Sequence, residues 1–269
     1  MAEMFEHLFE RKGPEDGDYC KDGFLYCGKC HTARERAVDI GGESITVSML
    51  CKCREREQEE AEQAEEAREH KRLVELRRSI ALTDQNMHEW TFANDDRSNP
   101  KLSDGMKKYA DGFDGYSATG KGLMLYGGVG TGKTYYAACI INQIVETHTA
   151  RFVTTGDLAT LPFDARREFV RDMTRADLVV LDDVGAERGT EYMQELVFSV
   201  VDARSRTGKP LIVTTNLDGK QIKAISELTQ RRIFDRIIGC CHPIAITGQA
   251  RRTEKAKNDY KKIQEELGI

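Results

Sequence analysis

The chain has 269 residues, of which 39% are hydrophobic and 32% are charged, and its formal net charge is −5 at pH 7. No apolar run approaches the roughly 20 residues that span a bilayer, so the sequence excludes an integral membrane protein. The negative charge argues against a protein that coats DNA through bulk positive charge, although a local cationic face stays open. The first residues lack the basic start and apolar stretch of a secretory signal, and we therefore expect a cytoplasmic protein.

The first 53 residues are rich in cysteine and glycine and contain five of the eight cysteines of the chain. Cys27 and Cys30 form a C-x-x-C knuckle, and Cys51 and Cys53 follow after twenty residues. Four thiolates from two short turns make a tetrahedral Zn²⁺ site, and the bound metal supplies folding energy that so small a module lacks. We therefore predict a structural zinc-binding module over residues 1–53.

Two other residues are alternative ligands for this site. Cys20 and His31 lie near the first pair in the sequence, and either could displace one of the four cysteines. A redox C-x-x-C motif is a further alternative, but it needs a thioredoxin-like βαβ context. The sequence offers only two short strand-like stretches, 24–26 and 45–47, which disfavours the redox interpretation.

The rest of the chain divides into a charged segment and a larger domain. Residues 54–80 are dominated by good helix formers and almost lack apolar positions before Leu73, which predicts a solvated helical linker. In the segment 81–269, apolar runs alternate with amphipathic stretches from about Trp90 onward, which is typical of βαβ units in a three-layer α/β domain. We predict its strands at 122–126, 150–154, 178–181, 211–215 and 244–247, and its helices at about 132–147, 164–174, 190–206, 219–226 and 229–238.

A phosphate-binding loop is the sharpest signal in the sequence. It satisfies G-x-x-x-x-G-K-[ST] between an apolar strand and a predicted helix, which is the context that the motif needs. Glycines let backbone N–H groups wrap closely around phosphates, and the new helix adds its positive N-terminal end. Lys133 would reach the β and γ phosphates of ATP, and the Thr134 hydroxyl would bind Mg²⁺. The loop consists of Gly127, Gly128, Val129, Gly130, Thr131, Gly132, Lys133 and Thr134.

A second acidic element makes hydrolysis possible. The apolar strand at 178–181 runs into Asp182 and Asp183. We expect Asp182 to hold Mg²⁺, directly or through water, and Asp183 to orient or deprotonate the attacking water. Glu187 is the alternative base. Together with the loop, this pair predicts a Mg²⁺-dependent ATPase.

Further polar residues follow where an ATPase that assembles side by side would need them. Asn216 ends the strand at 211–215 and could touch the γ-phosphate or position the water. Arg231, Arg232 and Arg236 lie on one helical stretch, and an arginine projected into a neighbouring subunit would make hydrolysis depend on assembly. Farther on, Arg251 and Arg252 could contact phosphate within the same subunit.

With these motifs in this order, the chain resembles the DnaC/DnaI/IstB group of AAA+ ATPases. The segments that carry the resemblance are 127–134, 178–187 (LVVLDDVGAE), 210–216 (PLIVTTN) and 231–237 (RRIFDRI), within roughly residues 80–253. The resemblance implies a P-loop NTPase core of the AAA+/ASCE type. It also implies a homo-oligomer formed through the AAA+ domains.

The resemblance assigns roles to particular residues and to the whole chain. It implies Arg232 as the arginine finger, Asn216 as sensor 1 and Arg252 as sensor 2. It further implies an ATP-controlled loader that binds the replicative hexameric DNA helicase and delivers it to single-stranded DNA during replication initiation. The cysteine module followed by a charged helix looks like the zinc-binding segment of many phage and Gram-positive loaders, which implies contact with the helicase.

Three other functions compete with this interpretation. An IstB-like helper of a transposase would use a near-identical core, although such helpers generally carry a different amino-terminal segment. A nucleotide kinase with a zinc-bound lid is disfavoured because all four cysteines precede the phosphate loop, whereas such lids follow it. A zinc-ribbon adaptor that only binds nucleotide would not need the carboxylate pair. The DNA contact stays unplaced, since Lys107, Lys108 and Lys121 lie outside the motifs and no aromatic platform is evident.

Overall fold

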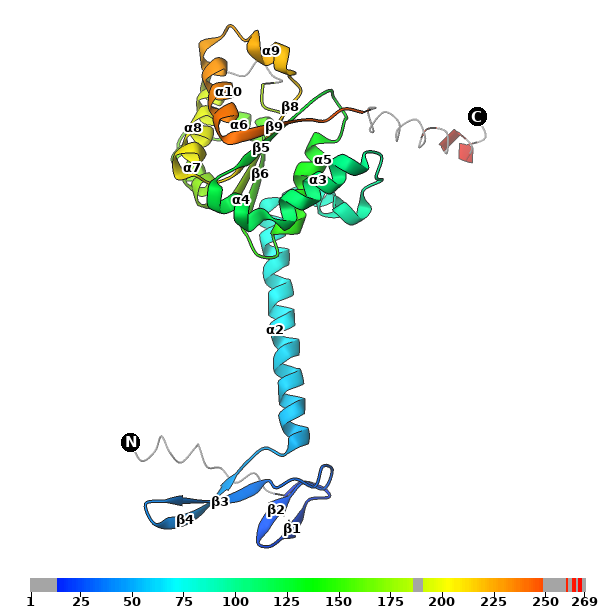
Figure 1. Cartoon of the computed structure of the whole chain (residues 1–269), viewed down its shortest axis with the longest axis vertical. Coiled ribbons are helices and arrows are strands. Elements are labelled where there is room, and N and C mark those ends of the chain that lie inside the picture. The colour runs from blue at the N-terminus through cyan, green and yellow to red at the C-terminus, as the bar shows by residue number, and fades with distance from the viewer. Residues whose placement is uncertain (1–13, 186–190, 249–259, 261–262, 265, 268–269) are drawn as a thin grey trace. The chain divides into compact units, whose positions relative to one another are not determined.

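Contacts between residues divide the chain into two compact units, Met1–Arg72 and Leu73–Ile269. Figure 1 shows the chain with elements of both units labelled where there is room. No helix among the described residues has the length and apolar character needed to cross a membrane. The computed structural model describes residues 14–185, 191–248, 260, 263–264 and 266–267.

Two short antiparallel hairpins form the strands of the first unit. β1 (Tyr19–Lys21) pairs with β2 (Phe24–Tyr26), and β3 (Glu35–Ile40) pairs with β4 (Glu43–Ser48). The two stretches predicted as strands lie within β2 and β4. Isolated hairpins are marginally stable in water, so a unit built from them needs a further source of stability.

The charged segment forms one continuous helix, α2 (Lys52–Ala81). Only Val74 and Ala81 of this helix are buried, and both pack into the core of the second unit. Arg77 also donates a hydrogen bond of 2.8 Å to the carbonyl of Glu146 in that unit. The last turns of α2 therefore belong to the second unit, whereas its first turns carry no apolar contact of this kind.

Five parallel strands form the sheet of the second unit, in the order β6–β7–β8–β5–β9. Because β8 lies between β5 and β7, the predicted phosphate loop after β5 and the carboxylate pair at the end of β7 flank the end of β8. The bounds are β5 (Gly122–Tyr126), β6 (Ala150–Thr154), β7 (Leu178–Asp182), β8 (Leu211–Thr215) and β9 (Cys241–Ala245).

The edge strand β9 departs from the prediction. It begins at Cys241, before the predicted start at residue 244, and it includes Pro243. Proline lacks the N–H that a central strand needs, but an edge strand tolerates it. Among the described strands β9 pairs with β5 alone, so the sequence pattern underestimated a strand at the edge of the sheet.

Helices cover the sheet and connect its strands. The helices predicted at about 132–147, 164–174, 190–206, 219–226 and 229–238 agree in position with helices of the structure. The segment before β5 also forms helices, and these were not predicted. Those earlier helices are η2 (Gln85–Glu89), η3 (Phe92–Asn94), α3 (Pro100–Asp111) and α4 (Phe113–Thr119). The later ones are α5 (Lys133–Ile144), α6 (Thr155–Thr160), α7 (Arg166–Arg175), α8 (Glu191–Thr207), α9 (Gly219–Lys223) and α10 (Leu228–Cys240).

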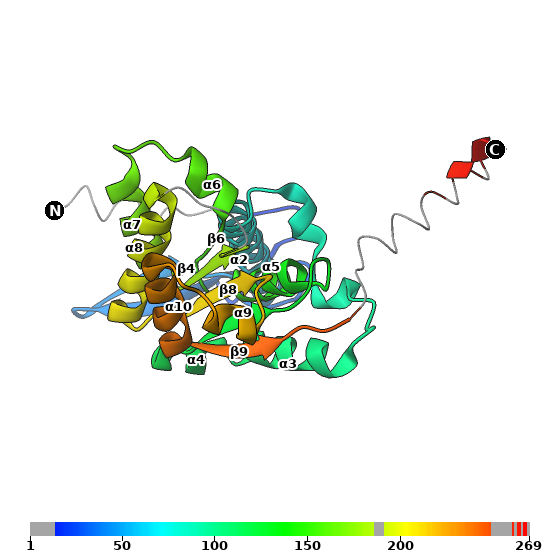
Figure 2. The ribbon, with the colours of Figure 1, turned by 90° about the horizontal axis from the view of Figure 1, so that it is seen from above.

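Alternating strand side chains give the domain two cores, one on each face of the sheet. Leu123, Leu125 and Ile212 pack into the core that includes α3 and α5. Met124 and Val213 point to the opposite core, which includes α8 and α10. Figure 2 shows α7, α8 and α10 on one side of the sheet and α3 with α5 on the other. The three-layer α/β architecture predicted from the sequence is confirmed, and it fixes the carboxyl ends of β5, β7 and β8 side by side.

Candidate functional site

The loop after β5 has a backbone that only glycine permits at its start. Gly127 has a φ of 149°, and a Cβ added there would lie 2.1 Å from the carbonyl oxygen of Ile246. Gly130 and Gly132 also have positive φ, at 79° and 99°. Val129 is 72% exposed at the tip of the loop. The loop therefore turns tightly into α5 with its backbone uncovered, as phosphate binding requires.

Lys133 begins α5 and is buried, with 4% of its surface exposed. Its Nζ donates hydrogen bonds to the carbonyls of Gly127 (3.1 Å) and Gly128 (2.8 Å). It also donates to Oδ1 of Asn216 at the end of β8, at 2.6 Å. The Thr131 hydroxyl closes the loop by donating to the Gly128 carbonyl at 2.9 Å. The ammonium group thus lies inside the loop, where it would meet the phosphates of a nucleotide.

Asp182 ends β7 and is buried beside the hydroxyl of Thr134. The Thr134 Oγ1 donates to one carboxylate oxygen at 3.2 Å, and the Thr214 Oγ1 donates to the other at 2.6 Å. Burial raises the pKa of Asp182 above its ordinary value; the charge of Asp183 acts in the same direction, and that of Lys133 opposes it. A hydroxyl and a buried carboxylate in contact are the oxygen ligands that Mg²⁺ takes, so the donor set fits this ion.

Asn216 connects the loop to the second carboxylate of the pair. Its Nδ2 donates to Oδ1 of Asp183 at 3.1 Å, while its Oδ1 accepts from Lys133. Hydrogen bonds therefore link the residues that end β7 and β8 to the lysine of the loop. The structure brings together the loop, both carboxylates and Asn216, as predicted. Glu187, the alternative base, lies outside the described residues.

The three arginines of α10 are exposed. The contacts of Arg232 and Arg236 are with α8 and not with the phosphate loop of their own chain. The Arg232 guanidinium lies 4.7 Å from the centre of the Phe198 ring. Arg236 forms an ion pair of 3.1 Å with Asp202, and within the described residues Arg231 has no ion-pair partner. Both partners belong to α8, so α10 presents its arginines on the outer surface of the domain. Arg251 and Arg252 lie outside the described residues.

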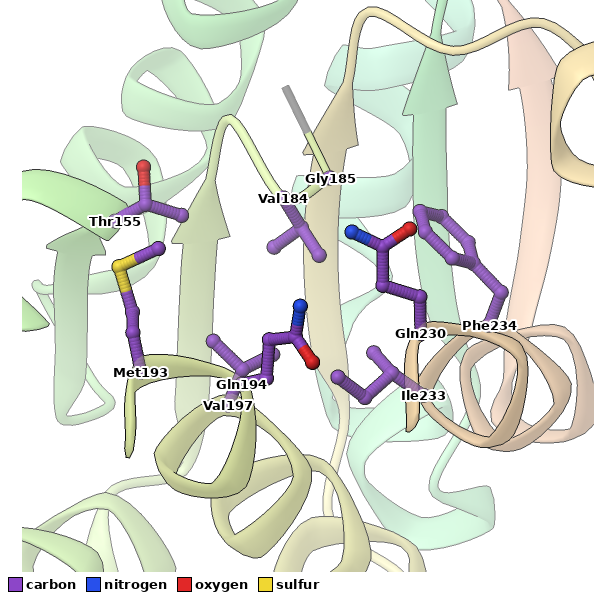
Figure 3. Close-up of a pocket in the computed structure, with 9 residues that line it drawn as sticks. All are labelled: Thr155, Val184, Gly185, Met193, Gln194, Val197, Gln230, Ile233 and Phe234. Atoms are coloured by element: carbon purple, nitrogen blue, oxygen red, sulfur yellow. The ribbon is translucent and has the colours of Figure 1, made fainter. Parts of the chain in front are cut away.

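A small cavity lies between the segment that follows the carboxylate pair and α10. It has a volume of about 30 Å³ and lies between the end of β7, α8 and α10. Figure 3 shows Val184 of the β7 end facing Gln194 of α8 and Ile233 of α10. A Cβ at Gly185, whose φ is 81°, would lie 2.9 Å from the Phe234 ring. The backbone beyond Asp183 is therefore packed directly against the helix that carries the arginines.

The four cysteines of the first unit meet in one cluster. The sulfur atoms of Cys27, Cys30, Cys51 and Cys53 all lie within 4.8 Å of one another. The Cys53 sulfur is 3.5 Å from that of Cys27 and 3.3 Å from that of Cys51. A zinc tetrahedron with Zn–S bonds of about 2.3 Å places its sulfurs roughly 3.8 Å apart, so the cluster has suitable dimensions for zinc.

The thiols of this cluster affect one another's ionisation. A hydrogen bond with the Thr32 hydroxyl lowers the pKa of Cys30 to about 5. Hydrogen bonds with Cys51 and with Cys27 raise the pKa of Cys53 to about 12. Four crowded thiols cannot all ionise without a cation, and a bound metal would remove that penalty. The donor chemistry therefore fits a metal ion.

The alternative ligands lie outside the cluster. Cys20 is exposed on β1, and His31 packs beside the ring of Tyr19, with 5.8 Å between ring centres. Neither belongs to the group of sulfur atoms that could share an ion within the described chain.

Phe163, just before α7, and Tyr192 of α8 form an aromatic surface that was not predicted from the sequence. Phe163 is 77% exposed, and its ring centre lies 6.1 Å from that of Tyr192. The Arg166 guanidinium lies 5.9 Å from the same Tyr192 ring, and Arg167 and Arg171 are exposed on the same helix. An isolated phenylalanine in a turn carries no motif, so only its exposure reveals it.

These features define the class of the protein. A phosphate loop on β5, a carboxylate pair on β7 and a polar strand end on β8 between them make this domain a P-loop ATPase of the AAA+ type. The family model described as IstB-like ATP binding protein matches residues 55–259, and the chain belongs to this family.

Characterised relatives are similar to part of the chain. The replicative helicase loader DnaC of Escherichia coli (strain K12) is 26% identical over 139 residues, which cover 49% of this chain and 54% of DnaC. The replicative helicase loader DnaI of Bacillus subtilis (strain 168) is 28% identical over 180 residues, or 60% of this chain and 58% of DnaI. The chain thus spans little more than half the length of these two relatives.

Solved structures agree on the fold. The crystal structure of DnaI aligns with a TM-score of 0.54 and 21% sequence identity, covering 65% of this chain and 98% of that one. The predicted fold class and the predicted resemblance are both confirmed.

Proposed function

We propose that this protein is an ATP-dependent loader that binds the replicative hexameric DNA helicase and delivers it to single-stranded DNA during replication initiation. The observation that carries the proposal is the combination of an ATP site of this family with a four-cysteine unit ahead of it in one chain. The two loader relatives support it. We place the protein in the cytoplasm, where that helicase acts.

The nucleotide chemistry follows from the contacts at the strand ends. Lys133 neutralises phosphate charge. Thr134 with Asp182 would hold Mg²⁺, which stabilises negative charge on the phosphate oxygens when bound. Asp183 accepts the proton of the attacking water, and Asn216 orients that water or the γ-phosphate. Asn216 already contacts both Lys133 and Asp183, so it is suited to couple phosphate binding to the base.

Assembly completes the site in this proposal. Arg232 is exposed on α10 and would act as the finger in the nucleotide site of a second copy, with Arg231 and Arg236 as alternatives. Arg252 would contact phosphate in its own subunit. Because the segment after Asp183 packs against α10, a neighbour that grips α10 can influence the carboxylate pair.

The remaining proposed contacts are those with the helicase and with single-stranded DNA. The zinc-binding unit, residues 1–53, would hold the helicase, with Cys27, Cys30, Cys51 and Cys53 as zinc ligands. Single-stranded DNA would stack its bases on Phe163 and place its phosphates near the exposed arginines of α7. Such stacking is sequence-tolerant, as a loader requires.

Co-purification with the replicative helicase tests the proposal. We expect a stoichiometric complex from the source cell, measured with and without ATP and single-stranded DNA. The double variant Cys51→Ser/Cys53→Ser should lose this complex, whereas Cys20→Ser, which changes an exposed cysteine outside the cluster, should keep it. A helicase that never co-purifies with the wild-type chain would refute the loader function.

The family model favours a second candidate function. Its description refers to IstB, so a helper ATPase of a transposase is the alternative. The same purification separates the two, because a stable partnership with a transposase in place of the helicase would establish the alternative.

A further inference from the structure

Thr214 is a buried residue of β8 that lies within the segment 210–216, although no role was predicted for it from the sequence. Its side chain is fully buried, and it lies one residue beyond the last paired position of β7 and β8, Leu181 with Val213. That pair is the last position in the register of the two strands. Contacts of the Thr214 hydroxyl and carbonyl take over at the point where the carboxylate pair begins.

Three consecutive residues of the β7 end are bound to this one threonine. The Thr214 hydroxyl donates to Oδ1 of Asp182 at 2.6 Å and accepts the backbone N–H of Asp183 at 2.9 Å. The Thr214 carbonyl accepts the N–H of Val184, also at 2.9 Å. Hydroxyl and backbone of a single residue therefore hold both carboxylate-bearing residues and the one that follows.

The backbone between these contacts is strained. Asp183 has a φ of 60°, in the left-handed region that residues with a side chain seldom adopt. Such a conformation costs of order 1–3 kcal/mol and persists only where neighbouring contacts enforce it. The two N–H groups on either side of the Asp183 carbonyl both end on Thr214. The turn directs the Asp183 carboxylate to Asn216.

We propose that Thr214 is a positioning residue that sets the geometry of both carboxylates, Asp182 for Mg²⁺ and Asp183 for the attacking water. The inference rests on the proposed Mg²⁺-dependent ATP site. A hydroxyl is needed because only it both donates to a carboxylate and accepts an N–H at one atom. Serine keeps this capacity, whereas valine has the shape of threonine without it.

The test compares three variants of the full-length protein. Thr214→Val removes the hydroxyl and Thr214→Ser retains it. Thr215→Val is the matched control, because Thr215 is equally buried on the same strand, but within the described part of the chain its hydroxyl accepts the N–H of Leu217 and contacts neither carboxylate. The first measurement is the affinity for a fluorescent ATP analogue with and without Mg²⁺, and the second is amide hydrogen exchange of a peptide that covers Asp183 and Val184.

We expect Thr214→Val to reduce the Mg²⁺-dependent gain in affinity by about 10–100-fold, as for other residues that orient a metal ligand. It should also speed hydrogen exchange at the β7 end, while affinity without Mg²⁺ changes little. Thr214→Ser should restore most of both properties, and Thr215→Val should retain the gain.

Two outcomes overturn different claims. If the wild-type protein gains no affinity from Mg²⁺, the proposed ATP site itself fails. If the wild type gains affinity and Thr214→Val matches it, or if Thr215→Val loses the gain equally, Thr214 has no positioning role. A fold defect would appear as faster exchange throughout the domain in Thr214→Val and in Thr214→Ser alike, and this result would also refute the inference.

Discussion

Two buried cations of the second unit lie at opposite ends of the sheet and interact with backbone carbonyls in the same way. Lys133 donates to carbonyls of the loop at the carboxyl ends of the strands. Arg204 of α8, which is fully buried, donates to carbonyls of residues before β7 and β8. A buried charge is stable only where such acceptors surround it. The two residues nevertheless differ in role, and substitution separates them.

Lys133→Ala should abolish tight nucleotide binding, because Lys133 supplies the main cationic contact with the phosphates. Isothermal titration with ATP and Mg²⁺ measures the effect. Lys220→Ala, which changes an exposed lysine of α9, is the control and should bind as the wild type does. Unaltered ATP affinity in Lys133→Ala would count against the site.

Arg204→Met should destabilise the domain without touching the nucleotide site. It leaves the carbonyls of Met173, Ala176, Asp177 and Pro210 without their common donor. Burial lowers the pKa of Arg204 to about 10, yet the group stays charged at neutral pH. We expect the free energy of unfolding to fall by about 3 kcal/mol.

Urea denaturation measures this loss of stability. Arg206→Met is the matched control, since Arg206 lies on the same helix with its side chain 72% exposed in an ion pair with Asp202. Exposed pairs contribute little, so the control should stay near the wild type. Equal stability of both variants would show that Arg204 is dispensable.

At the scale of elements, strands buried on both faces were the most predictable feature. β5 and β8 have the bounds that their apolar runs predict, because parallel strands between two helical layers need apolar side chains on both faces. The helices of the segment before β5 were not resolved from sequence. α3 contains Gly105 and several charged residues, so only its packing on α5 reveals its inner face.

Motifs located the nucleotide site because they record residues close in sequence. The role of Thr214 was not predicted, although the residue lies in the segment 210–216, and Phe163 lies in no motif. Thr214 matters through Asp182, which lies on another strand, and Phe163 is distinctive only by its exposure. Pairing of strand ends is three-dimensional information that spacing does not contain.

The element α10 carries a prediction about assembly. Arg232→Ala should lower ATP hydrolysis at least tenfold while leaving ATP affinity unchanged, because a finger acts on the neighbouring site. Mixing this variant with Asp182→Asn should restore part of the activity, since each copy supplies what the other lacks. Steady-state phosphate release measures both effects.

Arg236→Ala is the comparison for this experiment, as Arg236 is engaged with Asp202 in its own chain. A mixture that stays inactive, or an Arg232→Ala variant as active as the wild type, would exclude Arg232 as the finger.

At the scale of the whole molecule, the two units should respond separately to metal removal. A chelator should unfold the first unit and spare the ATPase domain, because the cysteine cluster lies entirely within the first unit. Protein purified without chelator should contain about one zinc ion per chain. Cys27→Ser should lose the metal, and Cys20→Ser should keep it.

Calorimetry with and without chelator checks this independence. The ATPase domain should keep its own melting temperature when the metal is gone. Absence of zinc from the purified wild type would refute the proposed zinc site of the first unit.

Cys53 lies inside the first turn of α2, and the carbonyl of Cys51 accepts the N–H groups of Arg54 and Glu55 that begin this helix. The turn proposed to bind the metal is thus also the start of a helix whose next apolar anchor is Val74, and we expect it to act as the nucleus of that helix. Without that nucleus, the intervening charged turns would have to hold their helical form by propensity alone, and isolated helices of that kind melt from the ends. Stripping the metal should therefore cost far-ultraviolet helical signal as well as hairpins, with the boundary between coil and helix advancing toward Val74.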